Sequence, residues 1–168
     1  MASNARLPVA EDPDLERDAA ELYDALSTLI RVHAFRDRDR ICCFDVSVSQ
    51  CYALEAVLRH GGLTVNGLAA ELYLDKSTAS RVVDGLERKG YVVRGRDPGD
   101  RRSVRLEATA EGRTLMRDIR RSILEEEKQL LAGFDPEVRR ALPELLSMLA
   151  RAAAERVEAS GGSCCRIP

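Results

Sequence analysis

Apolar residues recur every three or four positions over the first part of the chain, which is the spacing of one face of an α-helix. This pattern extends from residue 15 to about residue 36, and the charge run RDRDR at 36–40 is expected to end it in solvent. Two further helical patterns lie in the C-terminal third: one opens at Thr109, the other at Asp135-Pro136, a favourable N-cap and first-turn pair. Long amphipathic helices are therefore predicted near both ends of the sequence.

Three shorter helical patterns fill the middle of the chain, and each has a recognisable start. Ser47 followed by Gln50 matches a capping box, in which each side chain bonds the backbone N–H of the other residue. Thr64 is expected to cap the second helix and Asp75 the third, which should end at Gly90.

The spacing of apolar residues changes after residue 90. YVVRG at 91–95 and SVRLEA at 103–108 are short β-type runs, separated by the charged, turn-rich RDPGDRR at 96–102. Two short helices followed by a basic two-stranded hairpin make a winged helix-turn-helix. The predicted fold class is mainly α with a small β-hairpin wing.

The chain is predicted to fall into four parts. Residues 1–46 form an N-terminal arm, a dimerisation helix and a cysteine-containing connector, and residues 47–108 form the winged helix-turn-helix DNA-binding domain. Residues 109–158 form C-terminal dimerisation helices, and residues 159–168 form a flexible, cysteine-containing tail.

The first and last helices present apolar stripes that are too wide for a lone monomer with a small core. These stripes lie in LYDALSTLI at 22–30 and LPELLSMLARAA at 142–153. A homodimer held by its terminal helices is therefore expected.

Charge is distributed unevenly along the chain. The formal net charge is −2, yet residues 75–106 contain nine Lys and Arg against five Asp and Glu, a local net charge of +4. A basic segment on an acidic body predicts binding of double-stranded DNA there. The alternative use of such a domain, protein–protein docking without DNA contact, explains this concentration of charge less well.

The predicted DNA contacts lie on the third short helix and on the hairpin. Short hydroxyl and basic side chains at the start of that helix can reach base edges and phosphates, while arginines at the hairpin tip can enter a narrow minor groove. Asp97 and Asp100 are expected to orient Arg94 or Arg102 through carboxylate–guanidinium pairing. The full set is Lys76, Ser77, Thr78, Ser80, Arg81, Arg94, Arg101 and Arg102.

The run LTVNGLAAELYLDKSTASRVVDGLERKGYVVRGRDPGDRRSVRLEATAEG at 63–112 resembles the MarR family of transcriptional regulators. The resemblance implies a homodimer whose first and last helices intertwine, with each winged domain binding one half of a pseudo-palindromic operator, and it favours a repressor. It also places four of these residues on the family's recognition helix and one at the wing-tip arginine: Ser77, Thr78, Ser80 and Arg81, and Arg102.

The five cysteines fall into two groups, Cys42, Cys43 and Cys51 in ICCFDVSVSQC and Cys164 and Cys165 in the tail. No apolar run is long enough to span a bilayer and the first residues do not match a secretory signal, so a cytoplasmic protein with reduced thiols is expected. Adjacent side chains in extended backbone point to opposite sides, so one cysteine of each pair is expected to join a common site with Cys51. The helix N-terminus beside that site favours the thiolate form.

All-sulfur ligation selects a thiophilic ion such as zinc, copper(I), arsenic(III) or mercury(II), or an iron–sulfur cluster. The sequence therefore predicts a regulator whose DNA affinity is controlled by a cysteine cluster. Two alternatives remain open: thiols that sense an oxidant, and inert thiols in a repressor that responds to a small aromatic or organic ligand. Oxidant-sensing members of the resembled family usually carry a reactive cysteine in the first helix, and residues 15–36 contain none.

An enzymatic function is not expected. A nucleophilic cysteine needs a nearby base, and the two histidines, His33 and His60, do not stand at positions that suggest a dyad.

Overall fold

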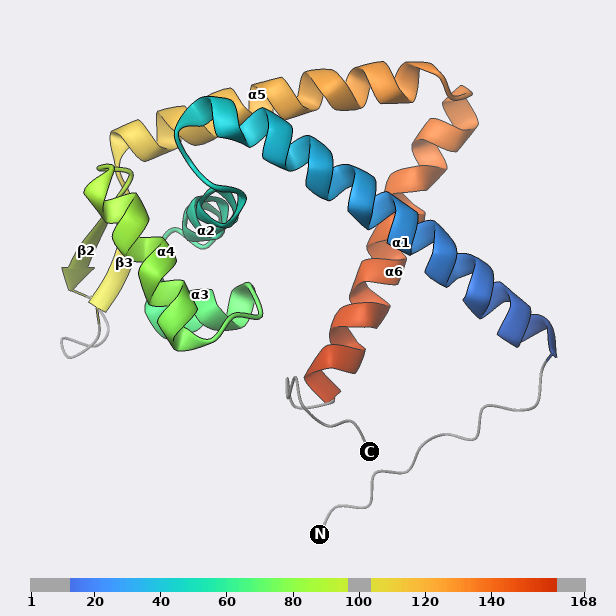
Figure 1. The fold of residues 1–168 in the computed structure, drawn as a ribbon, viewed down its shortest axis with the longest axis horizontal. Coiled ribbons are helices and arrows are strands. Elements are labelled where there is room, and N and C mark those ends of the chain that lie inside the picture. The colour runs from blue at the N-terminus through green and yellow to red at the C-terminus, as the bar shows by residue number, and fades with distance from the viewer. Residues whose placement is uncertain (1–12, 97–103, 160–168) are drawn as a thin grey trace, which may run out of the picture. The chain divides into compact units, whose positions relative to one another are not determined.

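The computed structural model of the protein describes residues 13–96 and 104–159 (Figure 1). The chain divides into two compact units, residues 1–39 and residues 40–168. No helix within the described ranges is long and apolar enough to cross a membrane.

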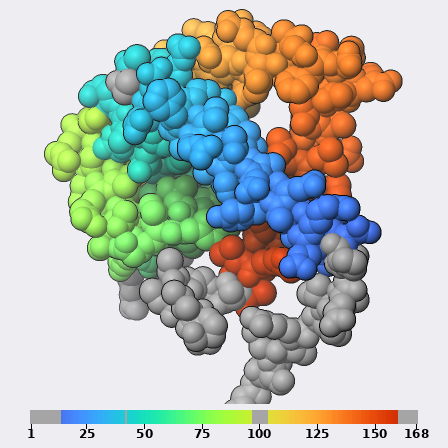
Figure 2. Space-filling model, turned by 45° about the vertical axis from the view of Figure 1, so that its right-hand side comes forward, coloured from blue at the N-terminus to red at the C-terminus, as the bar shows by residue number. Residues whose placement is uncertain are grey.

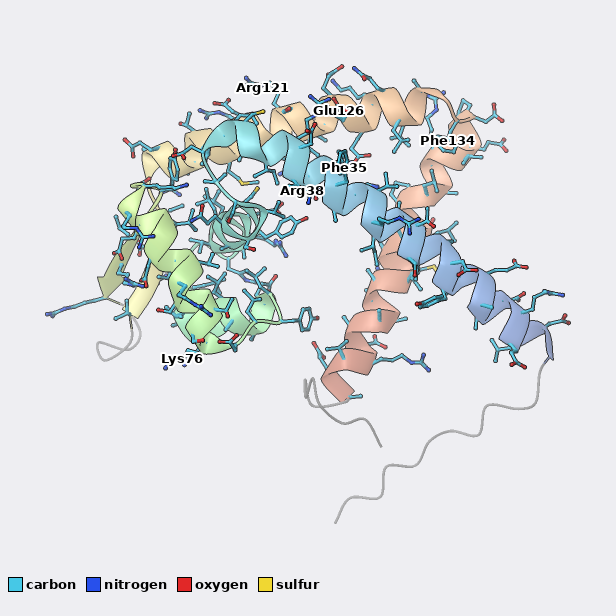
Figure 3. The ribbon with its side chains drawn as sticks, in the orientation of Figure 1. Phe35, Arg38, Lys76, Arg121, Glu126 and Phe134 are labelled. Atoms are coloured by element: carbon cyan, nitrogen blue, oxygen red, sulfur yellow. The ribbon has the colours of Figure 1, made fainter. Side chains whose placement is uncertain are left out.

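The described part of the first unit belongs to a single long helix, α1 (Pro13–Ile41), which continues through the RDRDR run. The prediction that this run ends the helix is wrong. Arginine is a good helix former and the run contains neither Gly nor Pro, so the backbone has no reason to stop there. Two arginines of the run have local partners: Arg36 Nη2 lies 2.9 Å from Asp37 Oδ1, and the Arg38 guanidinium lies 5.5 Å from the centre of the Phe35 ring (Figure 3). Arg40 instead pairs with Glu126, whose Oε1 lies 2.5 Å from its Nη2.

The second unit holds a winged helix-turn-helix followed by two long helices, as predicted. Its elements, in chain order, are the 3-10 turn η1 (Cys42–Phe44), α2 (Val48–Arg59), β1 (Leu63–Thr64), α3 (Val65–Glu71), α4 (Lys76–Arg88), β2 (Val92–Arg96), β3 (Val104–Ala108), α5 (Ala110–Ala132) and α6 (Pro136–Ala159).

The predicted helix starts are confirmed by their hydrogen bonds. The Gln50 backbone N–H donates to Ser47 Oγ at 3.2 Å and the Ser47 N–H donates to Gln50 Oε1 at 3.1 Å, which completes the capping box. Thr64 and Thr109 accept from the N–H groups three residues later and so cap α3 and α5. Capping is a local interaction, which is why sequence alone locates it.

The sheet has three antiparallel strands in the order β1-β3-β2, one more than predicted. Strand β1 has two residues and pairs Leu63 with Leu106 of β3. A two-residue strand has no periodicity to detect, and its pairing depends on a residue more than forty positions away. The predicted hairpin is confirmed, with Val92 of β2 opposite Ala108 of β3.

One apolar core holds the winged domain together. Side chains that are almost fully buried come from α2, α3, α4 and β3, including Leu54, Leu68, Leu86 and Leu106. Ile119 joins the same cluster and fastens the first half of α5 to it. In the space-filling view, α2, α3 and α4 form one continuous surface (Figure 2). The helices and the hairpin of the winged domain therefore share one apolar core.

Helix α6 is different, because it has no buried residue. Leu142, Leu145, Leu146 and Leu149 follow the three-and-four spacing of one helix face, yet Leu145 is 59% exposed and Leu146 is 48% exposed. The predicted apolar stripe is thus present on the helix and is not covered within the described chain.

Candidate nucleic-acid interface

Helix α4 begins at a tightly bonded acidic cap. Asp75 Oδ1 accepts from the Thr78 backbone N–H at 2.9 Å and from Ser77 Oγ at 2.5 Å, and Asp75 Oδ2 accepts from Thr78 Oγ1 at 2.6 Å. These donors, the hydroxyls of Ser77 and Thr78 foremost, hold the pKa of Asp75 well below its ordinary value. Because both hydroxyls donate to Asp75, their oxygens can act only as acceptors, and that of Thr78 already accepts from Arg81 Nη2.

The predicted contact residues on α4 occupy one face of the helix. Lys76, Ser77 and Arg81 are exposed, and Lys76 projects from the N-terminal end of the helix (Figure 3). Thr78 and Ser80 are half-buried, and Arg81 Nη2 donates to Thr78 Oγ1 at 3.1 Å. Ala79, Val83 and Leu86 of the same helix are buried and pack toward the core.

Arg94 on β2 lies against α4. Its Nη2 is 2.6 Å from Asp84 Oδ1 and its Nη1 is 2.5 Å from Glu87 Oε2. Its pKa is raised, mainly by the hydrogen bond to Asp84 and also by the charge of Glu87. Sequence reasoning missed both partners, since the spacing of ten and seven residues between them and Arg94 matches no local rule.

The wing tip lies outside the described residues. Four residues with predicted roles fall there: Asp97, Asp100, Arg101 and Arg102. Their roles therefore stay predictions.

A hollow of about 440 Å³ opens where α3, α4 and the wing meet. Lys76 lines it with an exposed cationic side chain, which suits the negative surface of nucleic acid, whereas the Arg94 guanidinium on its other side is paired with Asp84 and Glu87. The sequence did not predict the part of the lining at the start of α3, because Thr64, Val65 and Asn66 are recognisable only as a helix start and not as DNA contacts. The complete lining is Thr64, Val65, Asn66, Lys76, Ser80, Arg94 and Val104.

A larger groove of about 690 Å³ runs along α5 beside the end of α2. It combines apolar side chains with four arginines and a lysine against two glutamates, Glu125 and Glu127, and this positive balance suits an organic anion. Its lining includes Leu58, Met116, Leu124, Arg113, Arg117, Arg120 and Arg121.

The structure separates the two described thiols by environment. Cys43 is exposed in η1, whereas Cys51 is 2% exposed and belongs to the apolar core. The expectation of extended backbone at residues 42–43 is wrong, because a 3-10 turn forms there. The side chain of Cys42, and all of Cys164 and Cys165, lie outside the described part of the chain.

No group of three or more His, Cys, Asp or Glu within the described residues is arranged to hold a metal ion. The histidines have other surroundings. His60 Nε2 lies 3.3 Å from Glu71 Oε2 at the end of α2, and His33 lies half-buried on α1.

The turn η1 with the residues that follow it, 42–47, is called the cysteine turn below, and hydrogen bonds join it to the end of α4. Lys89 Nζ donates to the backbone carbonyl of Asp45, two residues after Cys43, and lies 3.4 Å from Gln50 Oε1. A Cβ at Gly85 would collide with the Gln50 side chain, so α4 and the start of α2 approach closely there. Movement of residues 42–47 would therefore change these contacts with α4.

Comparison with known proteins gives a consistent result. The profile of the MarR family matches residues 44–103. The HTH-type transcriptional regulator YfiV of Bacillus subtilis is 32% identical over 108 residues, which are 64% of this chain and 68% of that protein. The HTH-type transcriptional regulator PecS of Dickeya dadantii is 30% identical over 142 residues, 81% of this chain and 84% of that protein. The structure of a MarR family protein from Bacillus stearothermophilus superposes with a TM-score of 0.76 at 27% identity, covering 83% of this chain and 97% of that one.

Proposed function

The chain belongs to the MarR family of transcriptional regulators, and on that premise we propose that it acts as a repressor that binds a pseudo-palindromic operator as a homodimer. The observation that carries this proposal is the face of α4. Lys76, Ser77 and Arg81 are exposed side by side on a helix whose start is fixed by Asp75 and whose back is buried. A rigid helix with donors and acceptors on one face is what reading of a major groove requires.

The homodimer is supported by the uncovered apolar face of α6. A second copy of the chain would cover Leu145 and Leu146 and would remove an apolar stripe from water. Two winged domains related by a two-fold axis would then read two inverted half-sites.

Binding of duplex DNA is tested by fluorescence anisotropy of a labelled duplex over a series of KCl concentrations. We expect affinity to fall steeply with salt, because Lys and Arg contacts to phosphates release counterions. A protein-docking module would not bind the duplex at any salt concentration. Matched duplexes with and without the operator separate sequence-specific binding from general attraction to DNA.

The effector that we propose is a thiophilic ion acting through the cysteine turn. Cys43 is accessible to such an ion, and the Lys89 hydrogen bond links its turn to the end of α4. The other ligands would come from Cys42, Cys164 and Cys165. Cys51 is less suited to this role, because its position in the core would have to open first. Ion binding would release DNA only if the ion prefers one arrangement of the winged domains over the other.

A second candidate effector is an organic anion in the groove along α5. Arginines beside Leu58 and Met116 provide both the charge and the apolar contact that a small aromatic acid needs. Since the groove borders α2, which also packs against α4, a ligand there could move the reading helix.

One titration distinguishes the two effectors. Operator binding is followed while As(III), Hg(II), Zn(II), peroxide or an aromatic acid is added to the parent and to Cys43→Ser. Release by a soft ion in the parent but not in the variant supports the thiol effector. Release by peroxide alone would assign the thiols to oxidant sensing, and release by the aromatic acid in both proteins would assign the groove.

A further inference from the structure

The guanidinium of Arg94 occupies a fork between two carboxylates rather than open solvent. Asp84 and Glu87 are three residues apart on α4 and so lie on the same side of the helix, where each receives one Nη group of Arg94. The side chain of Arg94 is 31% exposed, and both partners are only partly exposed. The contact therefore joins β2 of the wing to the reading helix by two charge-assisted hydrogen bonds.

A second arginine on the same strand provides the contrast. Arg96 lies two residues further along β2, on the same side of the strand, and both arginines are exposed as whole residues. Among the described residues, the ion pairs of β2 are both made by Arg94, and none by Arg96. The difference between the two arginines is therefore the pairing of Arg94 with Asp84 and Glu87.

We propose that Arg94 is a positioning residue: it sets the spacing between α4 and the wing and neutralises Asp84 and Glu87, and it does not bind a DNA phosphate. The inference rests on the proposed function, because it concerns how the two reading elements are held for DNA. The geometry explains why two carboxylates are tolerated on a helix that approaches a polyanion: their charge is already matched. It replaces the sequence prediction that Arg94 is itself a DNA contact.

Removal of the carboxylates is the sharpest test. Simple electrostatics predicts that Asp84→Asn with Glu87→Gln, which removes two negative charges near DNA, strengthens binding. If Arg94 acts through these partners, the same double variant instead weakens operator binding, by about 3- to 10-fold for a pair of partly exposed ion pairs. The matched control is Glu107→Gln on β3, which removes a charge from the wing without touching the fork and should bind as well as the parent or better.

The salt dependence of binding gives a second readout. Arg94→Ala should lower affinity while leaving the slope of log affinity against log salt unchanged, because no phosphate contact is lost. Arg96→Ala should reduce the slope by roughly one ion. Arg94→Lys keeps the charge but cannot fork to both carboxylates, so it should restore only part of the affinity.

The comparison requires that each variant is folded and that the parent protein binds the duplex. Unfolding curves show whether a variant is folded, and if the double variant is not, Glu87→Gln alone is compared, since it keeps the Asp84 pair. Equal or tighter binding by the carboxylate variants, together with a reduced salt slope for Arg94→Ala, would overturn the inference and make Arg94 a phosphate contact. Failure of the parent to bind any duplex would instead overturn the proposed function.

Discussion

The winged domain and the terminal helices have the same spacing of apolar residues, but the apolar faces are buried in the winged domain and exposed on the terminal helices. In the winged domain Leu54, Leu68 and Leu86 are completely buried within their own chain. On α6 Leu145 and Leu146 are about half exposed, and on α1 Ile30 is 65% exposed. Periodicity therefore predicts that a helix has an apolar face, but it does not say whether the same chain or another copy covers that face.

The largest expected effect separates these two regions by stability. Leu86→Ala removes a fully buried side chain and should lower the free energy of unfolding by about 2–5 kcal/mol. Leu145→Ala at a monomeric dilution should change it far less, because that side chain is already in water. Urea unfolding of both variants measures the difference, and equal losses would contradict the contrast between the two regions.

A charge placed on the exposed stripe tests what covers it. Leu145→Asp with Leu146→Asp should raise the dimer dissociation constant at least about 100-fold, since unpaired charges in an apolar interface are costly. Light scattering over a range of concentrations measures it. Arg151→Asp, elsewhere on the exposed surface of α6, is the control for added negative charge. If the parent protein stays monomeric at micromolar concentration, the claim that a second copy of the chain covers this stripe is wrong.

The face of α4 should matter for DNA and not for stability. Arg81→Ala should weaken operator binding by about 1–3 kcal/mol and relax the sequence preference, as expected for a lost base contact. Arg102→Ala should mainly lower affinity and flatten the salt dependence, as expected for a groove contact of the wing. Anisotropy with the operator and with single-base variants measures both effects. If both variants bind like the parent, the reading surface has been placed wrongly.

The smallest effects should come from the cysteine turn. Cys43→Ser should leave the dimer and effector-free DNA binding within about twofold of the parent, because exposed substitutions rarely disturb a fold. Cys51→Ala is the matched core variant, and it is preferable to serine because a hydroxyl in the apolar core would cost stability. Loss of the soft-ion response in Cys43→Ser and its retention in Cys51→Ala would place the sensor at the surface. The reverse result would place it in the core.

Most of the fold could be predicted because it depends on local chemistry. Ser47, Thr64 and Asp75 cap their helices through residues three positions away, and the sequence shows these pairs directly. The end of α1 is not predicted correctly, because a charge run without Gly or Pro does not stop a helix. Strand β1 escaped prediction because two residues have no detectable period.

The sequence predicted which residue types form the candidate site, but it did not predict the ion pairs and the burial of individual side chains. The basic and hydroxyl residues of α4 could be found because they follow an acidic cap and lie opposite an apolar stripe. The partners of Arg94 are set by the packing of β2 on α4, which no short motif encodes. The burial of Cys51 likewise depends on the packing of the whole core. Its place in a helical pattern was compatible with burial but did not predict it.

In vitro selection from a pool of random duplexes tests the central claim most directly. A dimer with two winged domains should enrich two inverted half-sites whose centres are about one helical turn apart. Arg81→Ala, selected in parallel, should enrich a weaker or altered half-site, since α4 reads the bases. Enrichment of no sequence, or of a single unrepeated half-site, would contradict an operator-binding homodimer.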